Sequence, residues 1–293
     1  MPIHDAHARV TPFELLLPEE GFPQKRFPLI REEAEGRGGS LDTPESFLLL
    51  SETAVALREI REEDDAPERV QQHGALLFQA FHFWEEGHPL LLLDTAVVRY
   101  LVGNGPEEGE WSPSLPGKAG YIQLPQHLVW ALSAAGEPPE SLDGIFWAAP
   151  DGENVTLLIV MGIRKDRPGL AVVPLPTLPL GAAAHWASMA ARAEGEDFSS
   201  SLPGAEMEGL YAIESGGEAV KLAMRVFWYL DVFPGRAAEG VVLEAFEASG
   251  EGDVRGQGEA PVEATAAPDA PGGDAGPRPS RLPYRRVVLE EGS

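Results

Sequence analysis

The sequence contains no cysteine and very little lysine or asparagine. Without cysteine, the chain cannot form a disulfide, a thiolate nucleophile or a cysteine-ligated zinc or iron–sulfur centre. Only four lysines accompany 18 arginines, and asparagine occurs only at Asn104 and Asn154. Thermophilic proteins show this usage and GC-rich coding produces it as well, so the composition excludes some chemistry without indicating an origin.

Long apolar runs are also missing. No stretch of about 18 consecutive apolar residues occurs, so the sequence predicts no transmembrane helix. The N-terminal segment lacks the basic start and the long apolar stretch of a signal peptide. We therefore expect a cytoplasmic protein that does not bind membranes.

The two signs of charge are very unequal. The net charge is −25, and the segment from Ser249 onward contributes only −3 of it, through eight acidic residues and five arginines, which leaves −22 on the rest. A surface of this sign repels phosphate backbones, so nucleic acid is not an expected ligand. A basic protein or a cationic ligand is favoured instead, although acidity alone also keeps a protein soluble.

Signatures of common enzyme classes are absent as well. The sequence has no GxxxxGK[ST] phosphate loop, no GxSxG nucleophile elbow and no zinc-peptidase motif. The remaining catalytic candidates are His82 and Glu85, which share a predicted helix face, and His127 and His185 as general bases. No nucleophile stands beside His127 or His185 in the sequence, and a histidine near a helix C-terminus also stabilises the last carbonyls. We therefore assign no metal and no cofactor.

Helical signals dominate the region after the first forty residues. Thr43 is a good N-cap, and the apolar residues that follow at helical spacing predict a helix over 44–62. A second helix is predicted over 68–86, and the two form an antiparallel hairpin. The aromatic residues of the second helix cover too wide an arc for one face. The helix must therefore be buried on more than one side, or some of these residues must be exposed at a contact with a partner. Asp94 is expected to cap a short third helix.

Strand signals follow the helices. Segments rich in aromatic or β-branched residues predict strands over 121–124, 127–132, 144–148, 155–163 and 170–175. Asp151 and Gly152 predict a hairpin turn, the apolar fourth segment indicates a central strand, and prolines place the fifth at an edge. Two further helices are expected, over 182–193 and 215–233. The pattern predicts an α+β fold, in which an N-terminal helical hairpin and C-terminal helices pack with a mostly antiparallel sheet of about five strands.

The segment after the predicted fold changes character twice. Residues 249–276 have no aromatic residue, and glycine, proline and alanine occupy 16 of the 28 positions, which predicts a disordered linker with a reach of roughly 30 Å. A basic, apolar peptide with strand character follows, able to add to a sheet edge. The partner-binding residues that we predict in it are Arg278, Arg281, Leu282, Tyr284, Arg285, Arg286, Val287, Val288 and Leu289.

These signals divide the chain into an irregular proline-rich arm (1–41), a single α+β domain (42–248, with a helical part over 42–103 and the sheet and helices over 119–248), the linker (249–276) and a docking peptide (277–293). The function that they favour is that of a non-enzymatic interaction or accessory protein, which docks on a protein partner or a larger assembly through its termini. The C-terminal peptide has two other possible roles, to fold back on the chain's own acidic body or to be inert. Two other functions stay open: a hydrolase-type enzyme that uses the histidine and acidic candidates, and an acidic inhibitor or antitoxin that binds a basic partner in a salt-sensitive way. The sequence does not indicate the oligomeric state.

Overall fold

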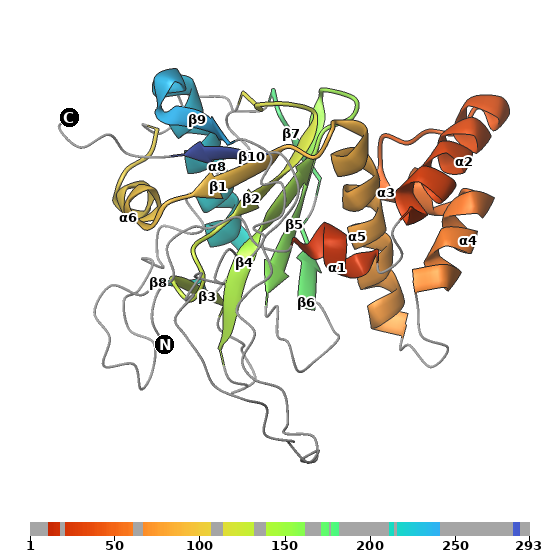
Figure 1. Ribbon diagram of the computed structural model, residues 1–293, viewed down its shortest axis with the longest axis horizontal. Helices are drawn as coiled ribbons and strands as arrows, with labels where there is room; N and C mark the ends of the chain where they lie inside the picture. The colour runs from red at the N-terminus through yellow and green to blue at the C-terminus, as the bar shows by residue number, and fades with distance from the viewer. Residues whose placement is uncertain are drawn as a thin grey trace, which may run out of the picture.

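The computed structural model of the chain is a mixed β-sheet with helices on both of its faces, which confirms the α+β class (Figure 1). It describes residues 11–17, 21–60, 67–106, 114–131, 139–161, 171–175, 177–181, 211–213, 216–240 and 284–287. The helices are α1 (Pro12–Leu16), α2 (Phe22–Arg37), α3 (Pro44–Leu48), α4 (Ser51–Ile60), α5 (Pro67–Glu85), α6 (Thr95–Gly103), α8 (Gly216–Val232) and the 3-10 turn η1 (Pro234–Arg236). The strands are β1 (Leu90–Leu93), β2 (Ala119–Gln123), β3 (Val129–Ala131), β4 (Glu140–Ala148), β5 (Asn154–Met161), β6 (Ala171–Pro174), β7 (Leu178–Pro179), β8 (Tyr211–Ile213), β9 (Ala237–Gly240) and β10 (Tyr284–Val287).

The sheet is larger and more mixed than expected. Its described part has ten strands, seven of which follow the order β6-β5-β4-β2-β1-β10-β9, while β3, β7 and β8 pair beside this path. The strands β2, β1 and β10 are mutually parallel, and the others on the path pair antiparallel. The prediction of about five mostly antiparallel strands is therefore wrong in number and in direction. It missed the Leu90–Leu93 strand, because four leucines have no β-branched or aromatic signal.

One face of the sheet is covered by the helices α1 to α5. Tyr121 and Phe146 point to this side and share a core with α5, as do Leu158 and Val160 of β5. Phe83 of α5 meets Phe146 edge to face, with 5.6 Å between the ring centroids. This contact joins the longest helix of the described chain to the middle of the sheet.

Helix α5 is buried on two sides, which explains its wide aromatic arc. Phe83 faces the sheet, whereas Phe78 and Phe81 contact Phe47 of α3 on the other side. Phe27 of α2 also packs against Phe81, with centroids 5.4 Å apart. The outer helices α2, α3 and α4 thus form a further layer beyond α5 (Figure 1), and the aromatic residues on two sides of α5 are buried in one core that joins this layer to the sheet.

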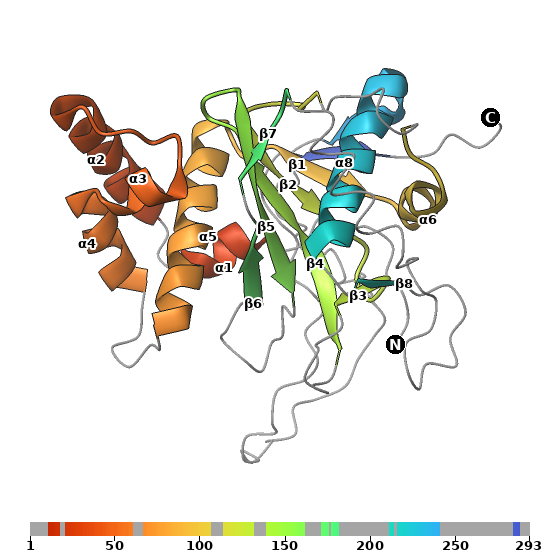
Figure 2. The same ribbon diagram turned by 180° about the vertical axis from the view of Figure 1, so that it is seen from behind.

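The opposite face of the sheet is covered by α6 and α8 (Figure 2). Trp147 of β4 contacts Phe227 of α8 edge to face, with 5.6 Å between the ring centroids. Arg225 of α8 donates hydrogen bonds to the carbonyls of Leu101 and Val102, at 2.7 and 2.6 Å, and so caps the C-terminal end of α6. Burial lowers the pKa of Arg225.

The N-terminal region differs from the irregular arm that we expected. Pro12 is the first residue of α1, and Pro23 lies in the first turn of α2, where the missing N–H of proline has no helical acceptor to lose. Pro28 lies inside α2 and is exposed. Phe27 and Ile30 have no exposed surface. The burial of these apolar side chains outweighs the helix-breaking tendency of the prolines, and α2 becomes part of the helical layer.

The helix predicted over 44–62 is broken after its first turn. It forms α3 and α4, with Leu49 between them and 86% exposed. The new N-terminus at α4 is capped from another helix: the carboxylate of Glu33 in α2 accepts the backbone N–H groups of Ser51 and Glu52, at 3.1 and 2.7 Å. These hydrogen bonds lower the pKa of Glu33. Arg26 of α2 adds an ion pair with Glu59 of α4.

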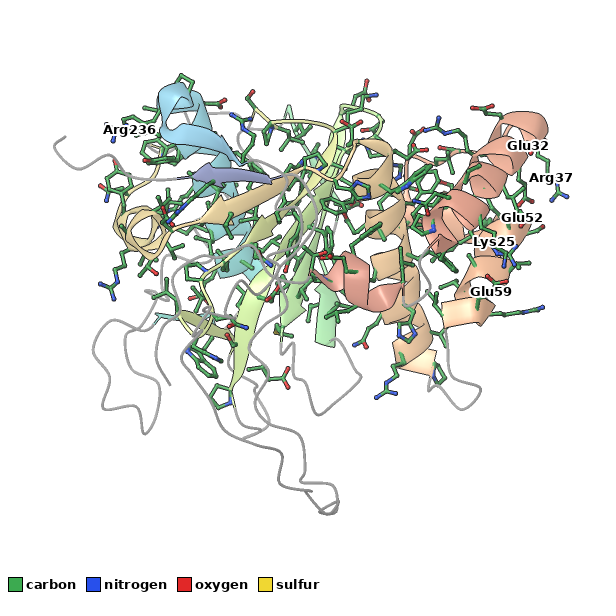
Figure 3. The ribbon with its side chains drawn as sticks, in the orientation of Figure 1. Lys25, Glu32, Arg37, Glu52, Glu59 and Arg236 are labelled. Carbon is green, nitrogen blue, oxygen red and sulfur yellow. The ribbon has the colours of Figure 1, made fainter. Side chains whose placement is uncertain are left out.

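Charged side chains cover the outside of this helical layer. Lys25 of α2 lies near Glu59 of α4 in Figure 3, and the Lys25 ammonium is 3.9 Å from the Glu59 carboxylate. Such exposed pairs contribute little to stability. The layer is therefore held mainly by its aromatic core and by the Glu33 cap.

Other sequence predictions agree with the structure. The predicted helix over 68–86 is α5, and Asp151–Gly152 forms the turn between β4 and β5. β5 contributes side chains to the cores on both faces, as expected of a central strand, and β6 is the edge strand. The helix predicted over 182–193 lies outside the described residues. None of the described helices is long and apolar enough to cross a bilayer.

Candidate functional site: the C-terminal strand

The C-terminal peptide forms strand β10 in the chain's own sheet. It pairs parallel to β1 on one side and antiparallel to β9 on the other. Arg286 lies opposite Leu92 of β1 and opposite Ala238 of β9. The predicted strand character is confirmed, and the position agrees with the fold-back alternative. The strand does not extend an edge of the sheet, however, because it is inserted between two other strands.

Asp94, immediately after β1, holds the end of β10 in two ways. Its backbone N–H donates to the carbonyl of Val287 at 3.3 Å. Its carboxylate accepts two hydrogen bonds from Arg286, from Nη2 at 2.8 Å and from Nε at 3.0 Å. Asp94 does occupy the N-cap position of α6, as predicted, but its side chain makes no capping hydrogen bond, because Arg286 engages it instead.

The neighbouring side chains of β10 have different surroundings. Val287 lies opposite Leu93 and has no exposed surface, within the core on the α8 side of the sheet. Arg285 lies opposite Leu91 of the same core and is half-buried. Its Nε atom is buried and makes no hydrogen bond in the described part of the chain. One residue of the strand therefore fits its site fully, while the residue two positions before it fits poorly.

The connection between β9 and β10 is far longer than their pairing requires. Two adjacent antiparallel strands can be joined by a two-residue turn, but 43 residues separate Gly240 from Tyr284. Two strands that are neighbours in the sheet are thus separated by a long stretch of sequence. The other predicted partner-binding residues, Arg278, Arg281, Leu282, Val288 and Leu289, lie outside the described residues.

No family model matches this sequence, and no curated protein is detectably similar to it.

The predicted catalytic pair on α5 has structural partners. His82 is 5% exposed, and its Nε2–H donates to the carbonyl of Leu41 at 2.9 Å. Its ring packs between those of Phe78 and Phe81. Burial lowers the pKa of His82 to about 4. His82 therefore stays neutral near pH 7 and connects α5 to the segment before α3.

Glu85 forms an ion pair with Arg31 of α2. Burial raises the pKa of Glu85, and the guanidinium of Arg31 opposes that change. The carboxylate thus joins α5 to α2 across the outer helical layer. His82 and Glu85 use different partners, and they converge on no common atom among their described contacts.

His127 lies between β2 and β3, far from α5 in the chain. Its φ of 62° is positive, and its ring stacks on Trp130, with 5.6 Å between the centroids. Its backbone N–H donates to the hydroxyl of Ser141 at 3.1 Å. His185 lies outside the described residues. Over those that are described, no group of three or more histidine or acidic side chains could hold a metal ion.

The structure also brings together two polar residues whose pairing the sequence did not predict. The Tyr121 hydroxyl of β2 donates to the carboxylate of Asp143 in β4. Asp143 stands where the register of the two strands β4 and β5 shifts, between Leu142 and Gly144. The nearest signal in the sequence was Asp143 itself, an acid beside the glycine of a strongly apolar strand.

Proposed function

We propose that the protein is a non-catalytic, cytoplasmic interaction protein and that β10 is its docking element. In the free protein this element is stored in the chain's own sheet. When it leaves the sheet it docks on a protein partner through its basic and aliphatic side chains. The observation that carries the proposal is the position of β10, a four-residue strand at the end of a 43-residue connection, between β1 and β9.

Local energetics support storage of this kind. Burial of a valine side chain contributes about 2 kcal/mol, and an ion pair as exposed as Arg286–Asp94 contributes less than about 1 kcal/mol. The side chains that hold β10 therefore contribute only part of the stability of a typical domain, which is about 5–15 kcal/mol. A short strand whose side chains contribute this little can open locally while the rest of the sheet stays folded.

The catalytic candidates give the alternative enzyme little support. The described contacts of His82, Glu85 and His127 are structural and involve three different partners; His82 and Glu85 lie on α5, whereas His127 lies between β2 and β3. A general acid–base site needs such groups within hydrogen-bond reach of one reacting atom. The interaction function does not need several polar groups near one atom. It uses β10, which lies between two strands at the end of a long connection.

A reversible lock on β10 tests the proposal. The chain has no cysteine, so Glu239→Cys with Arg285→Cys introduces a single disulfide pair at two residues that lie opposite each other in β9 and β10. Opposite residues of antiparallel strands have Cα atoms about 4.5–5.5 Å apart, within the range of disulfides. The oxidised protein keeps β10 in the sheet, whereas the reduced protein allows it to leave.

Partner capture is then compared between the two states of the same molecule. We expect the reduced protein to recover specific protein partners and the oxidised protein to lose them. The single variant Glu239→Cys, which cannot form the lock and keeps every residue of β10, is the control and should bind in both conditions. Recovery of the same partners by the oxidised and reduced forms would contradict the proposal.

A further inference from the structure

The slot that β10 fills is bounded by the backbone edges of β1 and β9. We propose that this slot is an acceptor site for an extended segment of another protein, which displaces β10. The segment carries an aliphatic residue, an arginine and a β-branched aliphatic residue in succession, at the places of Arg285, Arg286 and Val287. This inference rests on the proposed function, because both require β10 to leave the sheet.

The slot offers a backbone ladder on both sides. β10 pairs with all four residues of β1 and all four of β9. When β10 leaves, these strands present unpaired N–H and C=O groups, which is the arrangement that binds added strands. An incoming segment gains two ladders in place of the single ladder at an ordinary sheet edge. The direction is also set, because the segment must run parallel to β1.

Two side-chain positions define specificity. At the place of Arg286, the carboxylate of Asp94 accepts two hydrogen bonds from one guanidinium, a geometry that lysine cannot reproduce. At the place of Val287, the side chain is fully buried in the core on the α8 side. A short β-branched residue fits a strand position enclosed in this way. The segment therefore needs arginine followed by valine or isoleucine.

The third position, at the place of Arg285, favours an aliphatic residue over the arginine that this chain has there. Arg285 lies opposite Leu91, and its buried Nε atom makes no hydrogen bond in the described structure. A buried donor of this kind lowers affinity, because it loses water without gaining a protein partner. An aliphatic side chain at this position avoids the loss and adds apolar contact beside Leu91. A segment with valine there should bind more tightly than β10 itself.

The same comparison argues against a second copy of this chain as the occupant. The strand of a second copy makes the same contacts as β10 and has no intrinsic advantage over it. Because β10 belongs to the same chain, its effective concentration at the slot is about millimolar. A micromolar second copy cannot compete with that, whereas a partner segment of better fit can.

Three labelled peptides test the site on the unmodified full-length chain by fluorescence anisotropy. The first has the sequence of residues 281–289, RLPYRRVVL. The second carries valine at the place of Arg285, and the third combines that change with glutamate at the place of Arg286. We expect the second peptide to bind at least tenfold more tightly than the first and the third. Equal binding of all three would overturn the inference, and a first peptide as tight as the second would assign the slot to a second copy instead.

The disulfide pair Glu239→Cys and Arg285→Cys supplies a measurement that does not depend on a destabilised variant. Oxidation should weaken binding of the second peptide at least tenfold, and reduction should restore it. Binding that is unchanged by the lock would show that the peptide does not use the slot. If oxidation weakens binding of the peptide but does not change partner capture, the proposed function fails and the acceptor site stands. If oxidation prevents partner capture but does not change binding of the peptide, the acceptor site fails and the proposed function stands.

Discussion

Acid should destabilise the protein through His82, and the size of the effect follows from its burial. The folded protein holds the pKa of His82 at about 4, whereas a histidine in an unfolded chain has a pKa of about 6.5. Between these values the unfolded chain binds a proton that the folded protein does not. Stability is therefore unaffected by this group above about pH 7 and falls as the pH decreases from about 6.5 to 4.

The magnitude is large enough to measure. At pH 5 the unfolded state gains about 2 kcal/mol from protonation of His82, and at pH 7 it gains about 0.2 kcal/mol. Urea unfolding at pH 7 and pH 5, followed by tryptophan fluorescence, gives the free energy of unfolding at both values. We expect His82→Gln to lower stability at pH 7 but to lose about 2 kcal/mol less than the native chain between pH 7 and pH 5.

The variant is informative because glutamine keeps a donor for the carbonyl of Leu41 and cannot titrate. Burial also lowers the pKa of His88. Both the native chain and His82→Gln therefore retain the acid sensitivity that comes from that residue. His88→Gln is the control and should keep the part of the pH dependence that comes from His82, since it leaves His82 in place. If the native chain and His82→Gln lose the same free energy between the two pH values, the neutral, buried state of His82 is refuted.

Four further substitutions have defined outcomes. Glu33→Gln should lower the melting temperature at pH 7, because the amides that begin α4 lose a carboxylate acceptor; this deficit should disappear as the pH falls through the depressed pKa of Glu33. Gly144→Ala should lower the free energy of unfolding, measured in urea, by about 3 kcal/mol, because its Cβ would lie 2.1 Å from the carbonyl oxygen of Ile122. Gly36→Ala, with open space around it, should raise the free energy of unfolding by about 0.5–1 kcal/mol. Val287→Ala should destabilise by about 2 kcal/mol and make β10 more accessible to limited proteolysis; unchanged protection would refute the idea that this side chain anchors the strand.

Local signals predicted the elements whose burial is regular. The helix over 68–86 has its apolar residues at helical spacing, and it forms α5. The strand at Val155 has apolar side chains on both sides, and both sides are buried. The turn at Asp151 depends on hydrogen bonds within three residues, since its carboxylate accepts the N–H groups of Glu153 and Asn154 at 2.8 Å. Interactions between residues this close in the sequence can be recognised from the local sequence alone.

The elements that the sequence analysis missed depend on distant partners. The prolines of α2 are tolerated because Phe27 and Ile30 bury against other helices, and those contacts outweigh local propensity. The break between α3 and α4 is stabilised by Glu33, 18 residues before Ser51. β1 forms because strands from far along the chain lie on both of its sides. None of these partners is visible within a window of local sequence.

The C-terminal strand depends both on local sequence signals and on distant partners, and the distant partners determine the affinity that a binding partner needs. Its strand character is local, but its place depends on Asp94 and on the core around Val287. Together these side chains favour the stored state by about 3 kcal/mol, before the two ladders are counted, so fewer than about one molecule in a hundred is open at a given moment. A segment with an intrinsic dissociation constant of about 100 nM would then bind with an apparent constant of about 10 μM or weaker. Removal of the Asp94 carboxylate should therefore make partner binding through β10 tighter, because the open fraction rises. Binding of arginine-containing segments in the slot should change little, because β10 and the incoming segment lose the same ion pair, and this difference distinguishes the two roles of the same strand position.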